Sequence, residues 1–203
     1  MSLFTTLDTL EYTLIHSLQN LDGTILDSFF MYMSNISLMV MTFGIIIAFM
    51  IWRRHQLWKP LLFAVIVSAI MSSLINEWLF KMFLTEIGIF RPRPWTIHPD
   101  ILAIGHAFRD SSFPSSHMAF TTLLVMIVTY FEKRFLTFGI LIIILMWLSR
   151  IHNGMHYPSD ILIGTIMGVL YGYGWLWFMK QFLAEENIEN FWMKMRATKN
   201  LSL

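Results

Sequence analysis

The chain has 203 residues, of which 56% are hydrophobic and only 13% are charged, whereas about 25% of the residues are charged in a typical soluble domain. A single soluble core of this size could not bury so much apolar surface, so the composition excludes a disordered chain and argues for a protein embedded in a lipid bilayer. The absence of cysteine excludes disulfide bonds, Cys-ligated metal sites and thiol nucleophiles. The net charge of +1 by itself gives no information about nucleic acid, and we expect no nucleic-acid partner.

Residues 1–27 form the first predicted element, an amphipathic helix that lies in the membrane interface and does not cross the membrane. Its apolar residues recur at helical spacing, and they are Phe4, Leu7, Leu10, Leu14 and Leu18. Asp8, Glu11 and His16 lie on other faces of this helix. The segment has neither the basic start nor the uninterrupted apolar core of a signal peptide.

Five apolar stretches follow, each long enough or nearly long enough to cross a bilayer, which takes about 20 helical residues. They cover residues 28–51, 57–82, 115–131, 135–151 and 158–179. We therefore predict an all-α integral membrane protein, a bundle of five to six transmembrane helices. The last stretch carries a glycine stripe that we interpret as helix packing in preference to dimerisation: Gly164, Gly168 and Gly172.

The distribution of Lys and Arg predicts the orientation of these spans. Nine of these residues fall on one side, which is predicted to be cytoplasmic: Arg53, Arg54, Lys59, Lys133, Arg134, Lys180, Lys194, Arg196 and Lys199. The other five fall at the opposite face: Lys81, Arg91, Arg93, Arg109 and Arg150. An anionic substrate would account for cations on that face. Residues 1–180 are predicted to form one catalytic domain, and residues 181–203 a cytoplasmic tail.

Polar residues converge on the predicted outer face in three clusters. The longest polar interruption, residues 83–114, is predicted to be an extracytoplasmic active-site loop, because long irregular loops in compact proteins are often functional. The clusters are Lys81 with residues 91–95, then residues 111–117, and finally residues 149–160.

The third cluster contains Ser149, Arg150, His156 and Asp160 in the order S-R-x5-H-x3-D. This order resembles the third motif of the type 2 phosphatidic acid phosphatase (PAP2) superfamily of membrane lipid phosphatases. The resemblance implies a helical core like that of PAP2 enzymes and haloperoxidases.

The other two motifs of that family are matched in part. Pro114, Ser115 and His117 match P-S-G-H, with Ser116 in place of the glycine. The first motif, K-x6-R-P, is matched by Arg93 and the proline after it. The expected lysine position holds a glutamate, and the nearest lysine is Lys81, five residues earlier in the chain.

The resemblance implies a division of labour between two histidines. The histidine at the His156 position attacks phosphorus and forms a phosphohistidine. The one at the His117 position protonates the leaving oxygen and later activates water. Asp160, four residues beyond His156, is predicted to accept its ring proton and fix its tautomer.

The phosphate itself requires fixed cations and donors, because charge spreads over its oxygens during transfer. Arg93 and Arg150 can each hold phosphate oxygens with a planar fork. Ser115 and Ser116 lie at a predicted helix N-terminus, which is a natural anion site, and Lys81 is a further candidate. We expect no metal and no cofactor.

Some neighbouring residues are candidates for supporting roles. Glu77 lies four residues before Lys81, so an ion pair could hold the lysine toward the site, or could be purely structural. Arg91 and Gly154 are further supporting candidates, although an arginine at a span end is more often an anchor. The role of His152 is left open.

The substrate is predicted to be a membrane lipid phosphate whose tail enters laterally between helices. The run from Asp110 to His117 resembles the bacterial undecaprenyl-diphosphatase branch of the family, which implies undecaprenyl diphosphate as substrate, a role in cell-wall synthesis, and a site on the outer side of the bacterial inner membrane. The alternatives are phosphatidylglycerol phosphate, phosphatidic acid, a lipid A phosphate, or transfer of the phosphoryl group to an acceptor other than water. A non-catalytic transporter or scaffold that binds anionic lipid is the alternative outside the enzymes.

Overall fold

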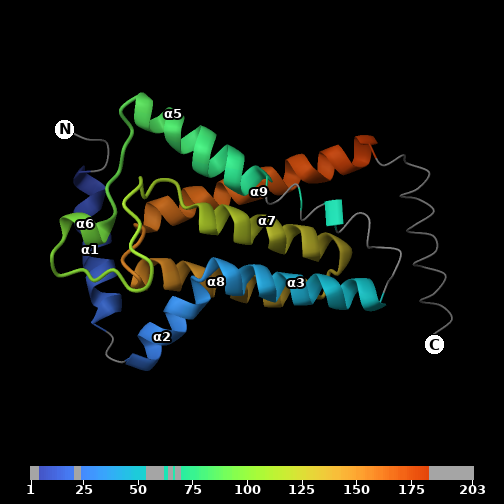
Figure 1. Ribbon diagram of the computed structural model, residues 1–203, viewed down its shortest axis with the longest axis horizontal. Coiled ribbons are helices and arrows are strands. Elements are labelled where there is room, and N and C mark those ends of the chain that lie inside the picture. The colour runs from blue at the N-terminus through green and yellow to red at the C-terminus, as the bar shows by residue number, and fades with distance from the viewer. Residues whose placement is uncertain (1–4, 21–23, 54–61, 64–65, 67–69, 183–203) are drawn as a thin grey trace.

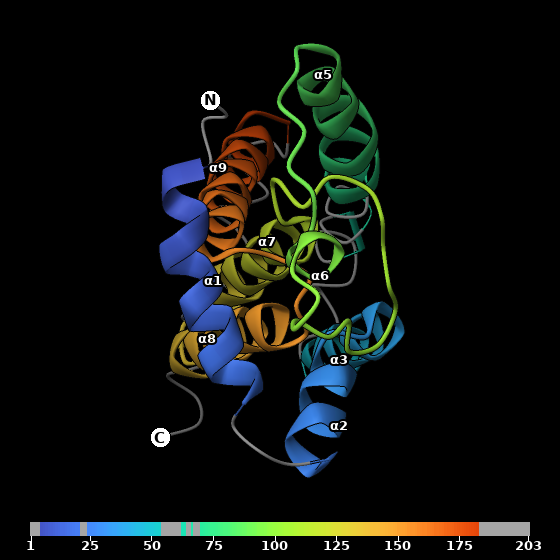
Figure 2. The ribbon, with the colours of Figure 1, turned by 90° about the vertical axis from the view of Figure 1, so that its left-hand side faces the viewer.

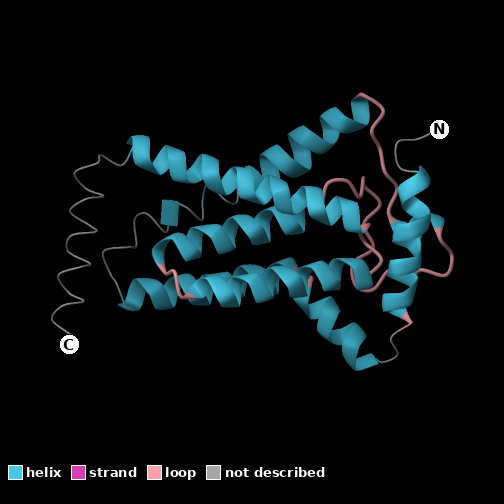
Figure 3. Ribbon diagram, turned by 180° about the vertical axis from the view of Figure 1, so that it is seen from behind, coloured by secondary structure: helices cyan, strands magenta, loops and turns pink. Residues whose placement is uncertain are grey.

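The structure is a computed structural model that describes residues 5–20, 24–53, 62–63, 66 and 70–182. Figure 3 shows helices and loops, with no strand in this described part of the chain. The predicted all-α class is therefore confirmed.

The helices are, in chain order, α1 (Thr5–Gln19), α2 (Thr24–Met33), α3 (Ile36–Arg53), the π-helix η2 (Met71–Phe80), α5 (Lys81–Glu86), α6 (Pro94–Ile97), α7 (Ser116–Phe131), α8 (Phe135–His152) and α9 (Pro158–Phe182). Helix α7 lies in the middle of the bundle and packs against α3, α8, α9 and η2 (Figure 1). Most of its side chains are buried, including Met118, Leu123 and Val128, which are fully buried. This central position fixes the N-terminus of α7, which opens into the site described below.

The glycine stripe of α9 faces α7. A Cβ atom added at Gly168 would lie 2.6 Å from the carbonyl oxygen of Ala119, closer than real Cβ atoms come to such an atom. Gly164 and Gly172 likewise contact α7, at Ser115 and Met126. The stripe therefore allows two helix backbones of one chain to approach closely, as the packing interpretation predicted.

Three described helices are long and apolar enough to cross a membrane: Ile36–Arg53, Phe135–His152 and Pro158–Phe178. Helix α7 is a shorter apolar helix, and it coincides with the predicted short third span. Much of the predicted span 57–82 lies outside the described residues, and its later part forms η2 and the start of α5. Large apolar side chains on the outside of the bundle, such as Val40 and Leu170, are exposed, which suits contact with lipid tails.

The predicted first span, residues 28–51, is wrong as a single helix. The chain breaks at Ser34 and Asn35, and α2 points away from α3 (Figure 1). The Asn35 side-chain oxygen accepts the backbone N–H of Leu38 at 3.2 Å, which caps the new helix. Ser34 accepts a hydrogen bond from the Asn153 amide at 2.9 Å. These two polar residues find partners that a continuous helix would not give them, so the span begins at Ile36.

The N-terminal amphipathic helix is also shorter than predicted, since α1 ends at Gln19 and α2 begins at Thr24. Helix α1 lies across one end of the bundle (Figure 2). Leu10 is 76% exposed, whereas Glu11 is buried and Ile15 is fully buried. The helix thus turns a face containing a glutamate toward the protein, which the apolar spacing did not predict.

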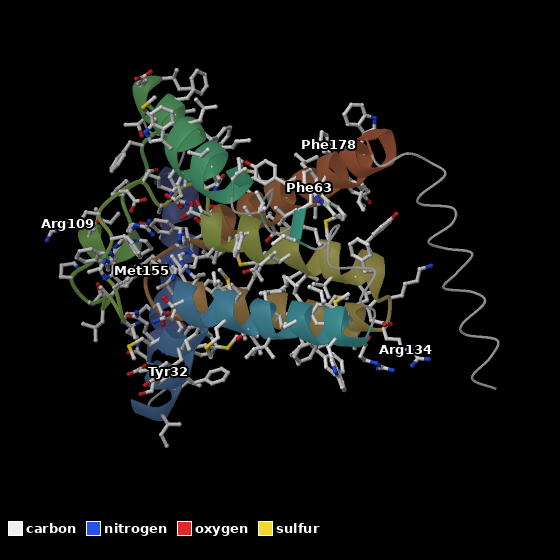
Figure 4. All side chains as sticks on the ribbon, turned by 45° about the vertical axis from the view of Figure 1, so that its right-hand side comes forward. Tyr32, Phe63, Arg109, Arg134, Met155 and Phe178 are labelled. Carbon is white, nitrogen blue, oxygen red and sulfur yellow. The ribbon has the colours of Figure 1, made fainter. Side chains whose placement is uncertain are left out.

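Charged residues separate to the two ends of the bundle. Figure 4 shows Arg109 at the end that carries the polar loops and Arg134 at the other end. Arg53 ends α3 near the Arg134 end, and the turn with Lys133 joins α7 to α8 there. The described members of the two cation groups that the sequence assigned to opposite faces, Arg109 and Arg134 among them, therefore lie at opposite ends of the bundle, whereas Arg54, Lys59, Lys194, Arg196 and Lys199 lie outside the described residues.

Candidate active site

The three polar clusters meet at one end of the bundle, around a cavity of about 210 Å³. Helices α7 and α9 begin at this end, and α8 ends there (Figure 2). The cavity is lined by Ile36, Met39, Glu77, Lys81, Arg93, Phe108, Asp110, Ser116, His117, Phe120, Arg150 and His156. Most of the predicted site residues are therefore brought together, although they come from segments far apart in the sequence.

Lys81 lies in this cavity despite its displaced position in the sequence. Lys81 is 6% exposed, and its Nζ donates to Glu77 at 3.0 Å and to Asp110 at 2.9 Å. The predicted ion pair with Glu77 is present in the structure. Lys81 directly follows the π-helix η2, whose wider turns change where it points compared with an α-helix. Motif spacing alone could not predict this placement.

Arg93 is held on two sides. Its Nε and Nη2 donate to one Asp110 oxygen at 3.2 and 2.7 Å, and its Nη1 donates to the Met155 carbonyl at 3.0 Å. Partial burial of the Asp110 carboxyl opposes ionisation, but Lys81 and Arg93 outweigh this effect and the net pKa of Asp110 is below its usual value. Asp110 therefore stays anionic and fixes both cations at the cavity. The sequence analysis did not predict this contact.

Arg150 has donors without protein partners. The residue is 3% exposed, and its Nε and Nη2 have no hydrogen-bond partner among the described residues. A buried guanidinium with unused donors is costly unless an anion completes it. Because Arg150 lines the cavity, the cavity is suited to a phosphate group.

The N-terminus of α7 provides further donors. Its N-cap residue, Ser115, makes no side-chain capping bond, so the first N–H groups of α7 are not capped from within the helix. Ser116 lines the cavity and accepts a hydrogen bond from Asn76 at 2.5 Å. Ser115 itself is fully buried and is not among the cavity-lining residues, and its N–H donates to the Asp160 carbonyl at 3.1 Å.

His156 has a defined ring orientation. Its Nδ1 lies 2.8 Å from the carbonyl oxygen of Ser112, which can only accept, so Nδ1 carries the proton. Its Nε2 lies 3.3 Å from Nη1 of Arg93, which can only donate. The lone pair of His156 is therefore on Nε2, next to a side chain that lines the cavity.

The predicted hydrogen bond from His156 to Asp160 is not formed. The Asp160 oxygen lies 3.8 Å from Nδ1, and the Ser112 carbonyl takes the proton instead. His156 precedes the start of α9 at Pro158, so the four-residue spacing does not correspond to a helical turn. Asp160 is fully buried and accepts from the Tyr157 backbone N–H at 2.9 Å.

Arg91 does not line the cavity, and it is not an anchor at the membrane surface. It is 1% exposed, and its Nη1 donates to Asp160 at 2.6 Å and to the Ser159 hydroxyl at 2.7 Å. Its guanidinium also lies 3.7 Å from the centre of the Tyr157 ring. Arg91 therefore contacts Asp160, Ser159 and Tyr157 beside the cavity, and its supporting role stays a prediction.

The remaining motif residues shape the backbone around the cavity. Gly154 has a φ of +67°, and a Cβ atom there would lie 2.6 Å from the Leu102 carbonyl, so a side chain would be strained in both respects. Ser149 donates to the Phe30 carbonyl at 2.8 Å, which ties α8 to α2. His152 lies within hydrogen-bonding distance of Asp27 at 2.7 Å and is buried outside the cavity.

Burial, followed by the charges of Arg93, Arg150 and Lys81, lowers the pKa of His156 well below its usual value near 6.5. The ring is therefore neutral at physiological pH. Among the described residues, no three acidic or histidine side chains are grouped as metal ligands. The arrangement provides a neutral imidazole lone pair beside cationic donors, which is suited to nucleophilic attack on a phosphate group.

The chain resembles known proteins in sequence. Residues 58–184 match the family model of the PAP2 superfamily. Undecaprenyl-diphosphatase BcrC of Bacillus subtilis is 29% identical over 160 residues, which make up 78% of this chain and 77% of the relative. The lipid A 4'-phosphatase of Bacteroides thetaiotaomicron is 29% identical over 131 residues, or 60% of this chain and 55% of the relative.

Two solved structures have a similar fold. The transmembrane PAP2-type phosphatidylglycerolphosphate phosphatase of Bacillus subtilis aligns with a TM-score of 0.69 and 19% identity, covering 88% of each chain. LpxE of Aquifex aeolicus aligns with a TM-score of 0.61 and 24% identity, covering 81% of this chain and 93% of the other. At these identities the likeness shows a shared fold.

Proposed function

Since the chain belongs to the PAP2 superfamily, a family of membrane lipid phosphatases, we propose that it hydrolyses undecaprenyl diphosphate to undecaprenyl phosphate and inorganic phosphate. The observation that carries the proposal is the convergence of His117, His156, Arg93 and Arg150 on one cavity. Two imidazoles and two guanidiniums around one space are what phosphoryl transfer through a histidine requires.

In the first step of the proposed reaction, Nε2 of His156 attacks the terminal phosphorus. The bond between phosphorus and the bridging oxygen breaks, and His117 gives its proton to that oxygen as undecaprenyl phosphate leaves. Arg93, Arg150 and the first N–H groups of α7 stabilise the charge on the phosphoryl oxygens. The Ser112 carbonyl keeps the ring proton on Nδ1, so Nε2 is the attacking atom.

In the second step, water attacks the phosphohistidine and gives a proton to His117. The bond between phosphorus and Nε2 breaks, and inorganic phosphate leaves. His156 returns to its neutral form with its proton still on Nδ1, and His117 is protonated for the next cycle. Lys81 is proposed to assist by contacting the phosphate from the η2 side, with Glu77 and Asp110 holding it in place.

Two observations support a lipid diphosphate as the substrate. The cavity lining includes four large apolar side chains, Ile36 and Met39 of α3 together with Phe108 and Phe120. A lipid tail can enter there laterally from the bilayer. The relative named undecaprenyl-diphosphatase also aligns over 77% of its own length.

We propose that the site lies on the outer face of a bacterial inner membrane. The cations at the far end of the bundle, including Arg53, Lys133 and Arg134, are those that the positive-inside rule assigns to the cytoplasm. On that face the enzyme would recycle a spent lipid carrier for cell-wall synthesis.

The test is phosphate release by purified protein in detergent, with a chelator present, from undecaprenyl diphosphate, phosphatidylglycerol phosphate, phosphatidic acid and a lipid A phosphate. We expect the fastest release from undecaprenyl diphosphate and at least about a 10³-fold loss in His156→Ala. His16→Ala serves as the control, because His16 lies outside the cavity.

Each contrary result removes a defined part of the proposal. Preference for another lipid would replace the substrate, and a phosphorylated acceptor among the products would replace hydrolysis by transfer. Activity that the chelator abolishes would contradict metal independence. Unchanged hydrolysis in His156→Ala would contradict the proposed catalysis as a whole.

A further inference from the structure

Asp160, which has an oxygen 3.8 Å from Nδ1 of His156, belongs to a group of three buried charged residues. Arg91 donates from Nη1 to Asp160 at 2.6 Å and from Nη2 to Glu11 at 2.5 Å. Asp160 is 0% exposed, Arg91 1% and Glu11 9%, and none of the three lines the cavity. We refer to these three residues as the Glu11–Arg91–Asp160 cluster. It connects helix α1, which precedes the matched residues 58–184, to the start of α9.

Glu11 uses both of its oxygens. While Oε2 accepts from Arg91, Oε1 accepts the backbone N–H of Ser159 at 2.6 Å. Ser159 lies in the first turn of α9, so Glu11 caps that helix from another part of the chain. In both contacts a Glu11 oxygen accepts a hydrogen bond, as an ionised carboxylate does. The two bonds fix Glu11 at the junction of α8 and α9, which carries His156 and Asp160.

The charges of the cluster determine what His156 faces. Arg91 and Asp160 alone would form a neutral pair, whereas Glu11 gives the cluster a net charge of −1. On the other side of the ring, Nε2 lies 3.3 Å from Nη1 of Arg93, and Lys81 and Arg150 line the same cavity and act on the ring with their charges. Attack on phosphorus through Nε2, with Nδ1 still protonated, makes the ring cationic, and those three cations oppose this change. The Glu11–Arg91–Asp160 cluster is anionic, and its nearest oxygen lies 3.8 Å from Nδ1. Its attraction for the positive charge on the ring offsets the repulsion by the three cations.

We propose that Glu11 is a positioning residue for phosphoryl transfer: it neutralises Arg91, so that the Asp160 carboxylate stabilises the His156 ring as the ring becomes cationic. The inference rests on the proposed function, because it assigns a role within that reaction. It makes α1 a part of the working site as well as a helix at the membrane interface.

The test is Glu11→Gln, which keeps the size and the acceptor oxygen but removes the charge. We expect kcat to fall about tenfold with KM within twofold of wild type, because the change affects a charge that develops only during transfer. The pKa of the His156 ring should fall further, since an anion behind it is lost. The Glu11→Gln substitution leaves the other charged and titratable groups around this ring in place: Lys81, Arg91, Arg93, His117, Arg150 and Asp160.

Two further variants separate this role from simple docking of α1. Glu11→Asp keeps the charge and should retain at least half of the wild-type kcat. Tyr12→Phe removes a hydrogen bond from the same helix to Asp100, away from the cavity, and should leave kcat and the His156 pKa unchanged.

Wild-type kcat in Glu11→Gln would overturn the inference, as would an equal loss in Tyr12→Phe. If Glu11→Gln does not fold, Glu11→Asp decides: a folded Glu11→Asp protein with a tenfold lower kcat contradicts the charge argument, and near wild-type kcat supports it. Failure of the proposed function looks different. Wild type would then release no phosphate from any lipid, and the His156 pKa in Glu11→Gln would still report whether the cluster acts on the ring.

Discussion

At the scale of single residues, the tautomer of His156 determines what the site can do. The Ser112 carbonyl at 2.8 Å requires the proton on Nδ1, which leaves the lone pair on Nε2 beside Arg93. Burial, together with Arg93 and Arg150, lowers the pKa of the ring, so the neutral nucleophile predominates at pH 7. A histidine with an ordinary pKa near 6.5 would instead be partly protonated at pH 7, and that protonated fraction could not attack.

This arrangement predicts a direct spectroscopic result. In protein labelled with ¹⁵N in its histidine rings, the His156 signals should show a neutral ring protonated on Nδ1 at pH 7, with a titration midpoint below 6.5. NMR titration in detergent measures both properties, and loss of the signals in His156→Gln provides the assignment. A midpoint at or above 6.5, or a proton on Nε2, would contradict the geometry of the resting site.

The ordered motifs allowed the sequence to predict the two histidines and two arginines of the cavity, but not how they are held. His117, Arg150 and His156 were predicted because they occupy positions of motifs that resemble those of the PAP2 superfamily. The Ser112 carbonyl was missed because a backbone acceptor has no side-chain signal. Glu11 was missed because nothing in the sequence links it to Arg91, 80 residues further along the chain.

At the scale of elements, the contact of α9 with α7 aligns the two helix starts that carry the site. Gly168 is close to Ala119 on the α7 backbone, whereas Gly174, six residues further along α9, has no atom of the described residues within 4 Å of an added Cβ. The two glycines therefore differ in packing while sharing one helix.

Substitution by alanine should separate them. Gly168→Ala forces α9 away from α7 and should destabilise the protein by about 1–3 kcal/mol, as overpacking does. Gly174→Ala should be neutral or slightly stabilising, because alanine favours the helix and meets no neighbour in the described part of the chain. Thermal unfolding in detergent measures both variants. Equal melting temperatures would show that the stripe does not govern the approach of the two helices.

Apolar runs predicted α7, α8 and α9 closely, because each run is continuous and ends at a polar turn. The same criterion failed at Ser34 and Asn35, since two polar residues barely change the mean hydropathy of a long window. It could not predict the π-helix η2 either. The hydrogen bonding of η2 depends on what it packs against, and it brings Lys81 to the cavity.

At the scale of the whole molecule, the site is assembled from segments that lie far apart in the chain. Helix α1, the loop before α6, the start of α7 and the junction of α8 with α9 meet at one end of the bundle (Figure 2). The distribution of cations predicted that these segments share a face. Only the folded chain shows that α1 covers that face and that the Glu11 carboxylate of α1 binds Arg91 there.

The stereochemical course of hydrolysis at the terminal phosphorus tests the account most directly. Each in-line displacement inverts the configuration, so two successive displacements, first by His156 and then by water, give net retention. The measurement uses undecaprenyl diphosphate whose terminal phosphorus is made chiral with sulfur and oxygen isotopes. We predict retention in the released thiophosphate, whereas inversion would mean that water attacks directly and that His156 never carries the phosphoryl group.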